Sequence, residues 1–138
     1  MYLLDTDTVV YLLKGHPRVR EHLSRHAQDV VGTSAVTLME LYHGVFKSQR
    51  VAANLARIRS LEQTGKIWDV GWETAEVFGI VKAQLEGDGV RLDDFDLAIA
   101  SCALGHDLTL VTNDTTHFGR IPGLRLENWA EALSDVPD

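Results

Sequence analysis

The residues best suited to chemistry in this sequence are acidic, and the first two stand in the opening stretch, residues 1–7. Three apolar residues at 2–4 run directly into Asp5, a pattern typical of a buried parallel strand that ends at the carboxylate. In open α/β sheets, ligands bind at this carboxyl end of the strands. Asp5 and Asp7 repel each other there, and a bound cation would offset the repulsion. The alternative is that Asp7 caps the next helix and that Asp5 is merely exposed.

Glu40 is a third candidate, because it interrupts the apolar pattern of a helix that Ser34 is expected to open. Val36, Glu40 and Gly44 are spaced four apart and therefore line one strip of that helix. A small residue beside a carboxylate leaves room for a metal ion, a water molecule or a substrate. The alternative is a solvated Glu on an ordinary helix.

Two more acidic stretches occur later in the chain. Asp93, Asp94 and Asp96 precede an Ala-rich helix, and one or two of them can cap it, so three exceed what capping requires. The predicted strand over 107–114 ends in Asp114. If this strand lies parallel to the first and beside it, their ends are about 4.8 Å apart, and Asp5 and Asp114 can face one cation.

The elements that must position these acids alternate between strands and helices, which predicts an α/β fold with a parallel sheet. A helix is expected to open at Pro17, with Val19 and Leu23 on one face. The other expected strands cover 2–4, 29–34, 66–70 and 124–126. The other expected helices cover 8–14, 34–46, 51–63, 73–86 and the stretch from 96 to Gly105. A last, small helix is expected around Trp129, with Asn128 as its cap. Phe46 and Ala75 are expected among the apolar positions of their helices.

Length, composition and charge further narrow the class of protein. The 138 residues suit one domain, and 45% apolar and 24% charged residues are typical of a globular chain. A net charge of −7 argues against broad electrostatic binding to nucleic acid, although acidic catalytic ligands contribute to that total. Cys102 is the single cysteine, so no disulfide can form within one chain; we expect a buried thiol and a cytoplasmic setting. We expect neither a signal peptide nor a membrane span.

Asp5, Glu40, Asp96 and Asp114 come from four segments that can converge at one edge of a parallel sheet. Their oxygen ligands favour Mg²⁺ or Mn²⁺ over zinc. Such ions orient a water molecule and stabilise a leaving oxygen, which is the chemistry of phosphodiester hydrolysis. Histidine chemistry has weaker support, because His43 and His117 are isolated in sequence; His22 and His26 are interpreted as surface residues.

With these acids identified, the chain resembles the PIN-domain endoribonucleases, specifically the VapC-type toxins of toxin–antitoxin pairs. The matching stretches are 3–7, Ser34 with 40–41 and Gly44, 96–100, 110–114, and 118 through 123–124 to 127–129. The resemblance runs from Met1 to about Leu133. No single stretch is specific, but all of them in this order and spacing are.

The resemblance implies a PIN-like α/β/α sandwich with strand order 3-2-1-4-5, a single domain over 1–133 and a loose tail over 134–138. It implies that Asp5, Glu40, Asp96 and Asp114 are the catalytic, metal-binding set for Mg²⁺ or Mn²⁺. The implied supporting residues are Thr6, Asp7, Thr112, Asn113 and Asp94. The implied partners are an RNA substrate, a VapB-like antitoxin and a second copy of the chain.

Two features depart from the family pattern. Asp7 stands where the family usually has Asn, so the site carries an extra carboxylate. Asp93 and Asp94 crowd the third acid; Asp96 is preferred because it precedes Ile99 by three residues, and Asp94 is the fallback.

Two other functions are left open. In the first, the stretch 5–9 fits the first motif of haloacid dehalogenase-type phosphatases, with Asp5 as a phosphorylated nucleophile. Gly87-Asp88 with Asp93 loosely resembles a later motif of that family, but it follows a helical pattern and would leave Asp114 unused. In the second, the chain is a non-enzymatic module that binds metal or protein. Basic residues between Lys14 and Arg59 can flank a groove, but each taken singly is typical of a solvated helix face, so none is assigned to substrate.

Overall fold

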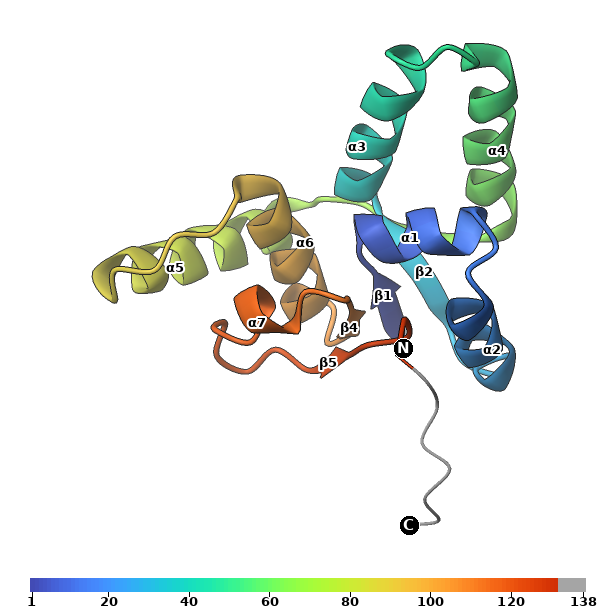
Figure 1. Cartoon of the computed structure of the whole chain (residues 1–138). Coiled ribbons are helices and arrows are strands. Elements are labelled where there is room, and N and C mark those ends of the chain that lie inside the picture. Colours follow the sequence, from blue (N-terminus) through green and yellow to red (C-terminus); the bar gives the residue numbers. More distant parts are fainter. Residues whose placement is uncertain (132–138) are drawn as a thin grey trace.

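A computed structural model describes residues 1–131 and shows helices and strands in alternation (Figure 1). In chain order the elements are β1 (Tyr2–Leu4), α1 (Thr6–Leu13), α2 (Pro17–Arg25), β2 (Val31–Ser34), α3 (Ala35–Phe46), α4 (Val51–Thr64), β3 (Lys66–Trp68), α5 (Trp72–Gly87), α6 (Asp94–Gly105), β4 (Thr109–Val111), α7 (Thr115–Phe118) and β5 (Leu126–Glu127).

The five strands form one parallel sheet in the order β3-β2-β1-β4-β5, which confirms the predicted fold class and strand order. β1 is the central strand and pairs with both β2 and β4. Leu4 lies opposite Val111, and the Asp5 amide donates a hydrogen bond of 3.0 Å to the Val111 carbonyl. The segments that follow β1 and β4 therefore leave the sheet side by side.

The core lies on both faces of the sheet, because alternate strand residues point to opposite faces. Leu3 and Leu110 belong to the cluster beneath α5 and α6. Leu4 and Val111 belong to the cluster that α1 to α4 cover. These four side chains are at most 3% exposed, and Figure 1 shows the two groups of helices on either side of the strands. This arrangement is the expected α/β/α sandwich.

Some local predictions are wrong. α1 begins at Thr6 rather than Thr8, because Asp5 supplies its cap. The segment around Trp129 is a turn through residue 131, not a helix; the Asn128 side chain accepts a hydrogen bond of 3.0 Å from the Ala130 amide. α7 was not predicted at all.

Several side chains also lie elsewhere than expected. Phe46 and Ala75 are exposed rather than packed in the core. His22 and His26 are not free surface residues, because both rings stack on the buried Trp129.

Within residues 1–131, no helix is long and apolar enough to cross a membrane. The expected domain end at 133 and the tail over 134–138 lie outside the described residues.

Candidate active site

Asp5 directly follows β1 and begins α1. Its side-chain Oδ1 accepts a hydrogen bond of 2.9 Å from the Thr8 amide, so it is the N-cap of the helix. The side chain is only 6% exposed, whereas Asp7 is exposed in the first turn of α1. The alternative in which Asp7 caps the helix and Asp5 is exposed is therefore wrong.

Burial raises the pKa of Asp5, because removal from water disfavours the charged carboxylate. Side-chain contacts with Thr112 and Thr8 act in the opposite direction and lower the pKa. The nearby charge of Asp7 raises it again. A positive charge beside Asp5 would relieve both the burial and the repulsion.

Glu40 reaches the same region from α3, and α1 holds its carboxylate. The Thr6 hydroxyl donates to Glu40 Oε1 over 2.7 Å and is also hydrogen-bonded to the Thr37 hydroxyl at 3.2 Å. Glu40 is half-buried and Thr37 is fully buried. The predicted supporting hydroxyl of Thr6 therefore orients this acid, and Thr37 is a buried contributor that the sequence did not indicate.

Asp96 shows that the acids converge. Its pKa is raised to about 6, first by burial and then, in decreasing order of effect, by the charges of Asp93, Glu40, Asp5 and Asp114. A carboxylate responds in this way only to charges that lie near it. The four predicted acids thus share one region at the carboxyl end of the sheet.

The other acids at the start of α6 have different surroundings. Asp93 is the N-cap, and its side chain accepts a hydrogen bond of 3.4 Å from the Asp96 amide. Asp94 is exposed and pairs with Lys82 on α5 at 3.0 Å. The geometry thus favours Asp96 over the fallback Asp94 as the residue that faces the other acids.

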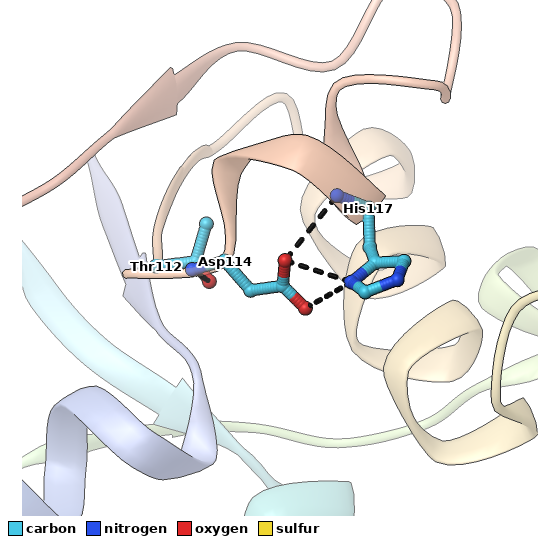
Figure 2. A network of polar contacts seen from close by, with 3 residues as sticks. All are labelled: Thr112, Asp114 and His117. Atoms are coloured by element: carbon cyan, nitrogen blue, oxygen red, sulfur yellow. Dashed lines mark hydrogen bonds and ion pairs between the residues drawn. The ribbon is translucent and has the colours of Figure 1, made fainter.

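Asp114 follows β4 and begins α7, and its side chain is held by His117 (Figure 2). His117 Nδ1 lies 2.9 and 2.7 Å from the two carboxylate oxygens, and the His117 amide donates to Oδ1 over 3.3 Å. The buried Thr112 hydroxyl accepts a hydrogen bond of 3.0 Å from the Asp114 amide. Because Thr112 also contacts Asp5, it connects the acids that follow the two neighbouring strands.

Asn113, between these residues, is exposed and accepts a hydrogen bond of 3.0 Å from the Asn128 side chain. It connects the end of β4 to the segment after β5. Its role as a supporting residue at the acids stays a prediction.

The chemistry of the donor set fits a hard divalent cation, because every acid offers carboxylate oxygen and their mutual repulsion favours a positive charge among them. Within residues 1–131, however, no three His, Cys, Asp or Glu side chains are grouped tightly enough to hold an ion directly. Mg²⁺ usually keeps several water molecules and takes only one or two carboxylates. The wider spacing suits such a hydrated ion.

Sequence reasoning assigned no role at the site to three residues of this region: Thr8, Thr37 and His117. The spacing Asp114 to His117 carries a usable signal, because an acidic residue three positions before an amide that needs a partner is typical of a helix N-cap. Thr8 and Thr37 lie in apolar stretches and gave no comparable indication.

The phosphatase alternative finds little support in the geometry. Asp88 is an exposed residue at the C-terminal end of α5, so its motif follows a helix rather than a strand. That motif is therefore not placed beside Asp5 by a neighbouring strand, as Asp114 is.

Comparison with known proteins agrees with this geometry. A family model described as PIN domain matches residues 2–124. The sequence is 37% identical over 130 residues to ribonuclease VapC2 of Haemophilus influenzae, covering 93% of this chain and 97% of that one. It is 36% identical over 130 residues to the tRNA(fMet)-specific endonuclease VapC of Shigella flexneri, covering 94% and 98%.

Among solved structures, the fold matches VapBC2 of Rickettsia felis, crystallised with a DNA fragment from its promoter. The TM-score is 0.87 at 34% identity, with 93% of this chain and 98% of that chain covered. These matches favour the nuclease interpretation over the phosphatase one.

Proposed function

This chain belongs to the PIN-domain family, and we propose that it is an endoribonuclease that hydrolyses RNA phosphodiester bonds with the help of Mg²⁺ or Mn²⁺. The observation that carries the proposal is the convergence of Asp5, Glu40, Asp96 and Asp114 from four elements. VapC ribonucleases that span nearly the same length support the choice of RNA as substrate.

The residues of the chain have separable roles in this reaction. Asp5, Glu40, Asp96 and Asp114 would hold the hydrated divalent cation, which supplies Lewis-acid stabilisation of the phosphate and of a leaving oxygen. Asp5 is anchored by its place as the cap of α1. Asp96 is charged only at some cost in the metal-free chain, because burial and the neighbouring carboxylates raise its pKa to about 6, and a cation held there would favour its ionised form.

The remaining supporting residues keep these acids in place. The Thr6 hydroxyl fixes the direction of the Glu40 carboxylate, and Thr112 connects the backbone of Asp114 with Asp5. Asp7 adds negative charge at the mouth of the site, which strengthens the attraction for a cation.

We further propose that the chain acts as the toxin of a VapBC-type pair in the cytoplasm, inhibited by a VapB-like antitoxin, and that it assembles as a homodimer. The structural relative from Rickettsia felis was crystallised as a VapBC complex, which supports the antitoxin. Expression of the chain alone should arrest growth, and co-expression of its antitoxin should relieve the arrest.

The decisive experiment is cleavage of RNA by the purified chain. Initiator tRNA(fMet) and an unstructured RNA would be incubated with EDTA, and then with Mn²⁺ or Mg²⁺ restored, beside the Asp5→Asn variant. We expect metal-restored cleavage that leaves 5′-phosphate ends and that is absent in the variant. Cleavage that survives EDTA, or a folded, metal-loaded chain that cuts neither RNA, would contradict the proposal.

The alternatives give different results in parallel assays. A non-enzymatic module would bind Mn²⁺ but cut no RNA. A phosphatase would form a trapped aspartyl-phosphate mimic on Asp5 with beryllium fluoride.

A further inference from the structure

We propose that the groove between α1, α3 and α4 binds the RNA strand next to the cleaved bond, and that Lys14 and Arg57 hold its phosphates there. The inference deepens the proposed ribonuclease function and depends on it. It assigns a binding role to two basic residues that sequence analysis could not distinguish from solvated helix faces.

The groove is continuous with the acid cluster. It has a volume of about 380 Å³ and is lined by residues of all three helices. Thr6 and Glu40, which are hydrogen-bonded to each other at the acids, also form part of its wall. A polymer whose scissile phosphate lies at the acids must continue past them, and this groove opens directly from that point.

The charge of the groove suits a phosphate backbone. Lys14 lies at the C-terminal end of α1 and Arg57 lies on α4, so the two cations line the same cavity from different helices. Both side chains are exposed, and within residues 1–131 neither takes part in an ion pair. In a chain with a net charge of −7, unpaired cations beside an acidic site are available to an anionic ligand.

The inner surface of the groove suits the sugars and bases. Val10, Leu13 and Ile58 supply apolar surface, and Gly44 leaves the groove wide, because a Cβ atom built there meets nothing within 4 Å. Asn54 also lines the groove, and its side-chain amide is oriented by a hydrogen bond of 3.1 Å to the Ser48 hydroxyl. An apolar surface with a few placed polar groups is typical of sites that bind nucleotide-sized ligands.

A protein segment is the competing occupant, since apolar surface also suits a peptide. RNA is favoured because Lys14 and Arg57 line the same cavity as Glu40, one of the four acids, which matches a strand whose phosphates continue past the cut. The test therefore measures RNA and antitoxin binding separately.

The experiment removes the two charges and follows RNA binding in a background that cannot cut. Lys14→Gln, Arg57→Gln and the double variant would be made in the Asp5→Asn chain, with EDTA present and initiator tRNA(fMet) as the probe. We expect each single variant to weaken RNA binding roughly tenfold, as removal of one charge-assisted hydrogen bond does. The slope of log Kd against log salt should fall by about 0.7 for each phosphate that the variant no longer neutralises.

Lys66→Gln and Arg18→Gln are the matched controls, because both residues are exposed and lie outside the groove, Lys66 at the start of β3 and Arg18 on α2. They should leave RNA affinity and its salt dependence unchanged. In the chain that retains Asp5, the groove variants should raise KM more than they lower kcat.

A second variant tests the space rather than the charge. Gly44→Met fills the groove without changing the net charge and replaces a glycine by a better helix former, so the fold should survive. We expect it to weaken RNA binding at least as much as either charge variant, while Gly44→Ala has a smaller effect.

Three results would overturn the inference. The double variant could bind RNA as tightly as the controls do, although the parent chain cleaves RNA. The groove variants could lose affinity only for the antitoxin, which would make the groove a protein site. If the parent chain neither binds nor cuts RNA with metal present, the proposed function itself fails and the subsite fails with it.

Discussion

Asp5 belongs to the acid cluster and also caps α1, and two substitutions separate these contributions. Asp5→Asn removes the charge but keeps a side-chain oxygen for the Thr8 amide. Asp5→Ala removes both. Because burial and Asp7 raise the pKa of Asp5, the charged form is unfavourable in the metal-free fold.

We therefore predict that both Asp5 variants lose RNA cleavage but differ in stability. In EDTA at neutral pH, Asp5→Asn should be at least as stable as the parent chain, whereas Asp5→Ala should fall below Asp5→Asn by about 1 kcal/mol through loss of the cap. Urea denaturation would measure both. A loss of several kcal/mol in Asp5→Asn would instead mean that the carboxylate is structural.

Asp96 predicts a pH dependence of the metal-free chain. Its pKa is raised from 3.8 to about 6, so between these values the folded state binds more protons than the unfolded state. The stability contributed by this group is therefore greatest below its unfolded pKa and is lost as the pH rises through about 6. Since the side chain is partly exposed, solvent reduces the effect to about 1 kcal/mol.

The measurement is unfolding in EDTA at pH 5 and pH 7.5, with Asp96→Asn as the comparison. We expect the parent chain to lose more stability than the variant between these pH values. Asp94→Asn, at the exposed residue paired with Lys82, is the control and should keep the parent's pH dependence. If the free energy of unfolding changes equally with pH in the parent chain and in Asp96→Asn, the pKa of Asp96 is not raised in the folded chain.

At the scale of elements, the ends of strands and the starts of helices build the site together. Asp5 and Asp114 follow the paired strands β1 and β4, and each is the N-cap of the helix that comes next. Asp93 caps α6 and so orients the first turn that carries Asp96. Helix N-termini favour anionic side chains, which helps to offset the cost of gathering these carboxylates.

Two glycines give opposite predictions about how the elements pack. A Cβ atom at Gly32 would lie 2.1 Å from the Lys66 carbonyl oxygen, so Gly32→Ala must separate β2 from β3. We expect Gly32→Ala to lower the free energy of unfolding by about 3 kcal/mol. Gly44 on α3 has open space around it, so Gly44→Ala should add about 0.5–1 kcal/mol through helix propensity. Equal effects of the two substitutions in chemical denaturation would contradict this assignment.

At the scale of the whole molecule, binding of a divalent cation to the folded state alone should raise the melting temperature. A concentration 100 times Kd corresponds to about 2.7 kcal/mol of stabilisation. Thermal unfolding of the parent chain and of Asp5→Asn would be compared with EDTA, Mg²⁺ and Mn²⁺. We expect a much smaller shift in the variant, and an equal shift in both would place the ion elsewhere.

The sequence by itself determined the architecture and marked the four acids as candidates. The apolar runs before Asp5 and Asp114 predicted two parallel strands, and the family resemblance predicted the strand order that makes them neighbours. These features are local or periodic, so they can be read without knowing which segments meet. The three acids at the start of α6 likewise indicated the region of Asp96, because they lie close together in the sequence.

Only the tertiary structure decided which neighbours each acid has. The contacts of Thr6 with Glu40 and of Thr112 with Asp5 join residues far apart in the chain. Lys14 and Arg57 are also far apart in the chain, and nothing in the sequence distinguished them from charges on solvated helix faces. The structure shows that they line the same groove between α1, α3 and α4. The pKa of a carboxylate and the role of a cation depend on burial and on nearby charges, and the packing of the helices on the sheet sets both.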